Sequence, residues 1–349
     1  MNKKSPRIYV FCPEEKKPIG GVKQLYRLVD VLNRNNFNAA IIHKNKNFRV
    51  NWFENSTNIS YFPALFNKVE QLNKKKNWKN KIKYLIKSKF GNNNLPEKDS
   101  IIIFPEVYGP YIHTIVSNRI IIFNQNCYYT YDNFPKYKKI NIHPYQYKNV
   151  IGTLVVSQDS LNYLKYAYEA DSIYRIHLGI SDAFSYNANK EKTIAFMPRK
   201  LSEDSSQIFH ILNNKLTNLG WNFISINNKS EKEVAAILNK AAIFLSFNYN
   251  EGFGLPPVEA MKSGCYVIGY GGNGGNEYFK EEFSSKIVDR DIISFVKEIE
   301  STCVKFNENP NYIIEKGKKA HDFITKNYNL INEENDIVYS FNQILKNNL

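Results

Sequence analysis

Short apolar runs alternate with stretches of helical periodicity along this 349-residue chain, and this alternation restricts the fold more than any other feature. The runs lie at residues 7–11, 38–43, 100–104, 119–123 and 152–157, and again at residues 193–198, 221–227, 242–247, 266–270 and 285–289. Alternation of this kind is typical of βαβ units, in which helices connect parallel strands. We therefore predict an α/β protein with two doubly wound parallel sheets. The chain is also longer than a domain with a single hydrophobic core usually is, so two domains are expected.

A polar segment separates the two predicted domains. Residues 180–192 show no hydrophobic periodicity, so we expect an N-terminal Rossmann-like domain at residues 1–183 and a C-terminal domain at residues 184–326. Residues 327–349 predict a final helix, because apolar side chains recur there at helical spacing. Its expected apolar stripe consists of Ile331, Val338, Phe341 and Leu345.

The stretch NYNEGFGLPPVEAMKSG holds two carboxylates, Glu251 and Glu259, with seven residues between them. It follows the apolar run 242–247, so we expect Glu251 on a loop at the carboxyl end of a strand. Gly252 and Gly254 allow the backbone to approach a ligand closely, and the two prolines favour a helix start. Glu259 is then expected in the first helical turn, where the helix dipole keeps it ionised as an acceptor for ribose hydroxyls. A capping role for Glu259 is the other interpretation.

The longer block EGFGLPPVEAMKSGCYVIGYGGNGGNEYF resembles the C-terminal signature of retaining, nucleotide-sugar-dependent glycosyltransferases of family 4, the glycosyl transferases group 1. The resemblance implies the GT-B fold, with two Rossmann-like domains facing across a cleft and the final helix returning to the first domain. It also implies that Glu259 binds the donor ribose and that Glu251 lies beside the donor sugar. Gly252, Phe253 and Gly254 would contact the donor with them.

Two adjacent cations, Arg199 and Lys200, follow the apolar run 193–198. Glycosyltransferases of the GT-B fold stabilise the departing diphosphate with cationic side chains and amides, so the resemblance implies catalytic roles for both residues without a metal or another cofactor. The chain departs from the family in one respect. Asp204 and Ser205 occupy the region where the family usually has a lysine.

The first domain has a weaker set of candidate residues. Gly20 and Gly21 precede a predicted helix, and the resemblance implies that they contact donor phosphate or acceptor. The family usually has a histidine after the run 119–123, where this chain has Asn124, Gln125 and Asn126 as possible sugar or acceptor contacts. Glu106, after another run, is a candidate for acceptor binding or base catalysis and equally for a surface acid.

Two short motifs favour other functions. Gly269, Gly271 and Gly274 match a dinucleotide-binding pattern, with Asp289 at a suitable distance, but this interpretation leaves the two glutamates and Arg199 without a role. Residues 289–291, Asp-Arg-Asp, match a metal-binding motif. Asp291 is more simply explained as the N-cap of the following helix.

Charge and cysteine usage restrict the environment. Nine lysines and one glutamate lie in residues 68–90 of a chain with a formal net charge of +14. This segment predicts a basic amphipathic helix, which either contacts anionic membrane peripherally or is a solvated surface helix. No recognition motif supports nucleic acid as a partner. The four dispersed cysteines and the lack of a membrane-length apolar run favour a cytoplasmic location, including the inner face of the membrane.

We therefore expect a retaining glycosyltransferase that moves a sugar from a nucleoside-diphosphate sugar to an acceptor hydroxyl. Polysaccharide, glycolipid or other glycoconjugate synthesis of bacterial type would be its setting. The alternative is a non-catalytic GT-B partner that binds a nucleotide sugar or glycan. The sequence specifies neither the donor sugar and base nor the acceptor.

Overall fold

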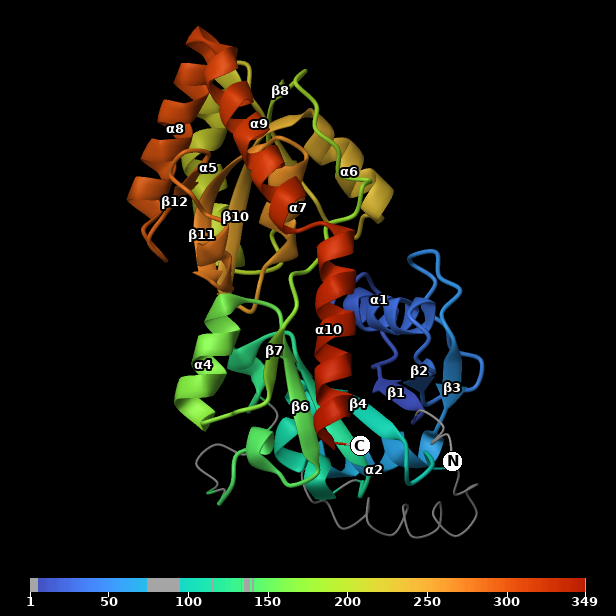
Figure 1. Cartoon of the computed structure of the whole chain (residues 1–349). Coiled ribbons are helices and arrows are strands. Elements are labelled where there is room, and N and C mark those ends of the chain that lie inside the picture. The colour runs from blue at the N-terminus through green and yellow to red at the C-terminus, as the bar shows by residue number, and fades with distance from the viewer. Residues whose placement is uncertain are drawn as a thin grey trace. The chain divides into compact units, whose positions relative to one another are not determined.

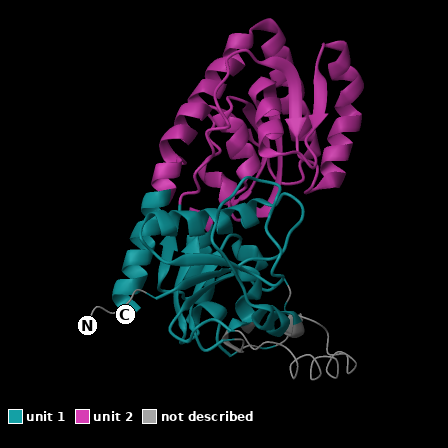
Figure 2. Cartoon of the chain, turned by 90° about the vertical axis from the view of Figure 1, so that its right-hand side faces the viewer, with its two compact units in different colours: residues 1–156, 160–176, 334–349 teal, residues 157–159, 177–333 magenta. Residues whose placement is uncertain are grey.

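The computed structural model describes residues 6–73, 95–114, 116–132, 134, 139 and 141–348. The chain divides into two compact units (Figure 2). Unit 1 comprises residues 1–156, 160–176 and 334–349, and unit 2 comprises residues 157–159 and 177–333. The lysine-rich segment predicted to form a basic helix lies outside the described residues from position 74 to position 90.

Unit 1 contains a seven-stranded sheet in the order β3-β2-β1-β4-β5-β6-β7, and every pair of neighbouring strands is parallel. The strands are β1 (Ile8–Phe11), β2 (Ala39–His43), β3 (Ile59–Tyr61), β4 (Ile101–Pro105), β5 (Arg119–Asn124), β6 (Val150–Val155) and β7 (Ile173–Arg175). The prediction of a doubly wound parallel sheet is confirmed here. The edge strands β3 and β7 were not predicted, since each has three half-buried residues and no apolar run.

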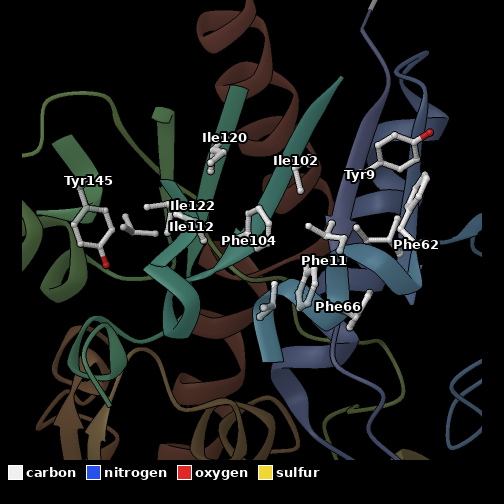
Figure 3. Packing of buried hydrophobic residues seen from close by; sticks show 14 of the residues in the cluster. Tyr9, Phe11, Phe62, Phe66, Ile102, Phe104, Ile112, Ile120, Ile122 and Tyr145 are labelled. Atoms are coloured by element: carbon white, nitrogen blue, oxygen red, sulfur yellow. The ribbon is translucent and has the colours of Figure 1, made fainter. Parts of the chain in front are cut away.

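The core of unit 1 explains why its central strands are continuously apolar. All four residues of β1 are buried, because helices cover both faces of a parallel sheet. On one face, side chains of the sheet pack against α2 (Pro63–Asn73) and α4 (Gln158–Tyr168). The rings of Phe11 and Phe66 stack at a centroid distance of 4.1 Å (Figure 3). Other members of this cluster in Figure 3 are Tyr9, Phe62, Ile102, Phe104, Ile112, Ile120, Ile122 and Tyr145.

The remaining helices of unit 1 are α1 (Gly20–Arg34) and the short 3-10 helices η1 (Glu106–Thr114), η2 (Cys127–Tyr129) and η3 (Pro144–Gln146). The last helix is α10 (Leu330–Asn348), labelled in Figure 1, and it belongs to unit 1 from Glu334 onwards. It packs closely on β6, because a Cβ added at Gly152 would lie 2.8 Å from Cδ1 of Ile344. Arg34 of α1 forms an ion pair of 2.8 Å with Glu334.

The predicted apolar stripe of α10 is confirmed at Phe341 and was wrong at its other three residues. Ile331 is 72% exposed, and Val338 and Leu345 are half-buried. The buried apolar side chains of this helix are Ile337, Phe341 and Ile344. These three residues follow the i, i+4, i+7 spacing of one helix face, so the helix is rotated relative to the stripe that the sequence favoured.

Unit 2 contains a five-stranded parallel sheet in the order β12-β11-β10-β8-β9. Its strands are β8 (Glu191–Phe196), β9 (Asn222–Ser225), β10 (Ala241–Glu251), β11 (Tyr266–Asn273) and β12 (Ser284–Lys286). The helices that accompany them are α5 (Ser202–Asn218), α6 (Glu231–Lys240), α7 (Leu255–Lys262), η4 (Gly274–Glu277), α8 (Ile292–Glu308) and α9 (Pro310–Asn327). The second predicted doubly wound sheet is thereby confirmed.

Candidate active site

Each sheet reverses its strand order at one point, and loops at such a point commonly bind ligands in doubly wound folds. In unit 2 the reversal lies between β8 and β10, which are neighbours although β9 intervenes in the chain. In unit 1 it lies between β1 and β4. The predicted site residues of each unit follow these strands or their neighbours.

In unit 2 an ion pair joins the loop after β8 to the end of β10. Nζ of Lys200 lies 2.6 Å from Oε1 of Glu251, and the two side chains are 24% and 18% exposed. The lysine is also 3.5 Å from the carbonyl oxygen of Tyr249. The structure therefore brings together two of the three predicted catalytic residues, at the reversal point of the sheet. Chemically, a lysine ammonium can donate to a phosphate oxygen and a carboxylate can accept from a hydroxyl.

The third predicted catalytic residue, Arg199, points differently from its neighbour. Its side chain is exposed and makes no hydrogen bond or ion pair with the part of the chain that the structure describes. Lys200 and Arg199 are adjacent in sequence, but Lys200 is half-buried and contacts Glu251, whereas Arg199 is exposed.

Glu251 is the last residue of β10, whereas the sequence predicted that it lies on a loop. The strand continues beyond the predicted run because β11 continues with it, and Glu251 pairs with Asn273 after an irregularity in the register. Pairing with β11 fixes the backbone of Glu251, which holds the carboxylate more firmly than a loop would.

The loop Gly252–Gly254 is buried and is held in place by Tyr278. The Tyr278 hydroxyl is 2.8 Å from the carbonyl oxygen of Phe253 and 3.0 Å from that of Gly254. Burial raises the pKa of Tyr278, so its hydroxyl remains protonated and donates to these carbonyls. Phe253 is 2% exposed, and its ring packs against Tyr278 and Tyr328.

Glu259 lies in the second turn of α7, and its predicted place in the first turn was wrong. The helix begins at Leu255, because Gly254 has a φ of +83° and ends the extended chain there. Pro256 and Pro257 then occupy the first turn, in which the missing amide hydrogens cost nothing. Glu259 is half-buried, and it is not the cap of its helix, since that position belongs to Gly254.

The glycines at the end of β11 and the start of η4 permit close packing against β10 and the loop that follows it. A Cβ on Gly274 would lie 2.1 Å from the carbonyl oxygen of Gly252, and one on Gly272 would lie 2.8 Å from Cβ of Asn248. In a dinucleotide-binding motif the third glycine opens an α-helix, but Gly274 opens only the four-residue η4. Gly272 and Gly274 are therefore explained by close packing against β10 and the loop Gly252–Gly254.

The predicted N-cap role of Asp291 is confirmed. Its carboxylate accepts a hydrogen bond of 3.0 Å from the amide of Ser294 at the start of α8. Among the residues that the structure describes, no group of three or more His, Cys, Asp or Glu side chains is arranged to hold a metal ion.

In unit 1 the predicted residues also come together. The Gln125 amide side chain donates to the carbonyl oxygen of Gly21, at 3.2 Å, and the Gln125 backbone amide donates to Oε2 of Glu106, at 3.0 Å. Gly20 and Gly21 form the first two residues of α1, whose N-cap, Ile19, provides no side-chain hydrogen bond. The structure thus links the loops after β4 and β5 to the start of α1.

Glu106 is buried, at 5% exposure, and accepts hydrogen bonds from the backbone amides of Gln125 and Asn126. Burial raises the pKa of this carboxyl to about 7. The surface-acid interpretation of Glu106 was therefore wrong. Its contacts fix the backbone that carries the predicted amides.

The three predicted amide side chains differ in their surroundings. Asn126 caps η2 by accepting from the amide of Tyr128 at 3.1 Å. Asn124 is fully buried and donates to the hydroxyl of Tyr145 at 2.6 Å, while its Oδ1 has no hydrogen-bond partner among the described atoms. Gln125 is half-buried and is the most accessible of the three.

Sequence reasoning missed the residues that support these loops. Tyr278 and Tyr270 belong to the glycine-rich segment, yet no pattern indicated that their hydroxyls would bond to Phe253 and to Asp204. Asp204 was noted only as a departure from the family. Two tyrosines within one glycine-rich segment are the one sequence signal that would have drawn attention to them.

No helix within the described ranges is long and apolar enough to cross a bilayer.

Comparison with known proteins gives a family match that lies within unit 2. Residues 212–320 match the family model of glycosyl transferases group 1. A similar curated protein is an alpha-1,6-glucosyltransferase of Actinobacillus pleuropneumoniae serotype 7 (strain AP76), which is 31% identical over 214 residues. The match covers 58% of this chain, and this chain spans 60% of the length of that relative.

Solved structures show the fold. Sucrose-phosphate synthase from Thermosynechococcus elongatus is similar with a TM-score of 0.64 and 13% identity, over 98% of this chain and 100% of that one. HepE of Anabaena, in complex with UDP and glucose, is similar with a TM-score of 0.63 and 11% identity, over 96% and 99% of the two chains. The GT-B fold and the resemblance to glycosyl transferases group 1 are both confirmed.

Proposed function

Since residues 212–320 match the glycosyl transferases group 1 and the chain has the GT-B fold, we propose that this protein moves a sugar from a nucleoside-diphosphate sugar to an acceptor hydroxyl. The observation that carries the proposal is the contact of 2.6 Å between Lys200 and Glu251. It joins the loop after β8 to the end of β10, where the strand order reverses. The proposed transfer requires a cation that binds phosphate beside a carboxylate that binds the sugar, and Lys200 and Glu251 form such a pair.

The donor that the relatives favour is UDP-glucose. One relative is named as a glucosyltransferase, and the HepE structure holds UDP and glucose. We propose that Glu259 binds the ribose of the donor, whereas Glu251 binds the sugar. The backbone of Gly252, Phe253 and Gly254 provides amides beside them.

We propose a transfer with retention of configuration. The bond between the anomeric carbon and the diphosphate oxygen breaks, and a bond from the acceptor oxygen to the same face of that carbon forms. The proton of the acceptor hydroxyl passes to the departing phosphate oxygen. Lys200 stabilises the negative charge that develops on that oxygen, Arg199 adds a second cation, and Glu251 stabilises positive charge on the sugar ring. These groups provide the charge stabilisation for which other glycosyltransferases use a metal ion.

Unit 1 provides a further set of polar groups. The half-buried amide of Gln125 and the start of α1 at Gly20 and Gly21 are candidates for contacts to donor phosphate or acceptor. Glu106 holds the Gln125 backbone in place, and we assign it this supporting role instead of base catalysis.

The proposal is tested by measuring UDP release from UDP-glucose and from a panel of other nucleotide sugars, with EDTA present throughout. Slow hydrolysis by water reports on donor activation when the acceptor is unknown. We expect Lys200→Gln and Glu251→Gln each to lower the rate about 100-fold or more. Lys215→Gln is the matched control, because it removes a surface Lys–Glu pair with Glu300 in the same unit.

Near-normal turnover in both site variants would contradict the proposal. Donor binding without hydrolysis or transfer would favour a non-catalytic GT-B protein that assists another enzyme. A glycan or lipid-linked acceptor, a cytoplasmic location and peripheral contact with anionic membrane through residues 68–90 remain predictions.

A further inference from the structure

Arg290 occupies an unusual position at the edge of the unit 2 sheet that carries Lys200 and Glu251. It lies in the loop between β12 and α8, with a φ of +69°, which few residues other than glycine adopt. Its Nη1 lies 2.9 Å from Oδ1 of Asp204, in the first turn of α5. The two residues are separated by 86 positions in the sequence.

Asp204 is held in place by more than this ion pair. Its side chain is 4% exposed, and its second oxygen accepts a hydrogen bond of 3.0 Å from the hydroxyl of Tyr270. A buried carboxylate needs a cation and hydrogen bonds to be tolerated. Asp204 therefore provides a fixed anchor for the guanidinium of Arg290.

The strand order shows where this guanidinium lies. Arg290 follows β12, whereas Asp204 follows β8, and β11 and β10 lie between them. The ion pair therefore lies at the carboxyl-end edge of the sheet, where α5 and α8 begin. The guanidinium reaches the ring of Tyr249 near the end of β10, at 5.8 Å from the centroid. Lys200 contacts the carbonyl oxygen of the same tyrosine, so both cations lie next to Tyr249.

The guanidinium of Arg290 carries more N–H donors than its contact with Asp204 uses. An arginine guanidinium carries five N–H groups, and the contact with Asp204 is the one hydrogen bond that the guanidinium of Arg290 makes to the described residues. Its side chain is 55% exposed. A planar guanidinium with open N–H groups is suited to bidentate binding of phosphate.

We propose that Arg290 binds the diphosphate of the donor and that Asp204 is the positioning residue that holds it there. This inference rests on the proposed function, since it assigns a third cation to the same nucleotide site. It also explains how the chain compensates for the acidic residue at position 204. Arg290 supplies positive charge next to Tyr249, near the end of β10, from a different loop.

The test compares the affinities of nucleoside diphosphates and monophosphates by isothermal titration calorimetry, beginning with UDP and UMP and continuing with the guanosine, adenosine and thymidine pairs. We expect Arg290→Gln to weaken diphosphate binding about tenfold or more, and to weaken monophosphate binding much less, because a charge-assisted hydrogen bond to the diphosphate is lost. Lys192→Gln, at the amino end of β8, is the control and should change neither affinity.

A second variant protects the test against misfolding. Arg290→Gln leaves the buried Asp204 without its cation, so the double variant Asp204→Asn/Arg290→Gln removes both charges together. It should fold, as judged by its thermal midpoint, and show the same loss of preference for diphosphate. An unchanged preference in both variants would overturn the role of Arg290. Failure of the wild-type protein to bind any nucleoside diphosphate would instead refute the proposed function.

Discussion

The buried carboxyl of Glu106 is expected to make the stability of unit 1 depend on pH. This side chain accepts the backbone amide of Gln125 at 3.0 Å, and burial is the largest influence on its ionisation. The pKa rises from 4.5 to about 7. Because the folded state raises the pKa of an acid, the folded protein binds the proton more tightly than the unfolded chain does.

The sign of the effect follows from this difference. The contribution of Glu106 to stability is fully present below pH 4.5 and is lost as the pH rises through about 7. A difference of this size corresponds to about 3 kcal/mol of unfolding free energy between the two limits. Replacement by glutamine removes the titrating group and preserves the shape of the side chain.

Hydrogen exchange in urea, followed in the peptide that carries Gln125 and Asn126, measures the unfolding free energy of this unit. Between pH 4.5 and pH 8, the stability of wild type relative to Glu106→Gln should fall by up to about 3 kcal/mol. Glu308→Gln, at an exposed position of α8, is the control. If the wild-type and Glu106→Gln values run parallel over this range, the carboxyl is not coupled to folding and the reasoning fails.

Two further substitutions test the packing around the site. Gly274→Ala places a Cβ 2.1 Å from the carbonyl oxygen of Gly252, so we expect a lower thermal midpoint and weaker nucleotide binding, with an unchanged midpoint as the contrary result. Tyr26→Phe removes the hydroxyl that lies 2.7 Å from Nε2 of the buried His43. Burial lowers the pKa of this histidine to about 4. We expect the unfolding free energy from chemical denaturation to fall by about 1–3 kcal/mol, and a fall below about 0.5 kcal/mol would contradict this expectation.

Much of the fold could be predicted from local pattern. A strand that is buried on both faces must be apolar throughout, and every predicted run corresponds to a strand of one of the two sheets. The edge strands β3 and β7 escaped prediction because one partner strand stabilises three residues without a continuous apolar run. The face of α10 was misjudged because Ile331 matches the helical spacing but lies on the exposed side.

The candidate site was predictable where function depends on residues at the carboxyl end of a strand. Glu251 and Lys200 each come after a predicted apolar run, and adjacent parallel strands bring their carboxyl ends together, so the contact of 2.6 Å is a consequence of strand order. The orientation of a side chain is a different matter. Arg199 precedes Lys200 directly and nevertheless faces solvent.

The contact between Arg290 and Asp204 could not be predicted from local pattern. That pattern places residues 289–291 in a short acidic motif and explains Asp291 as a helix cap, which the structure confirms. It assigns nothing to the arginine between the two acids. The contact depends on the positive φ at Arg290 and on α5 and α8 beginning at the same edge of the sheet. Such a contact between two distant loops is found only when the whole fold is known. Measuring how Arg290 contributes to nucleotide binding therefore tests the candidate site at a residue that the sequence did not indicate.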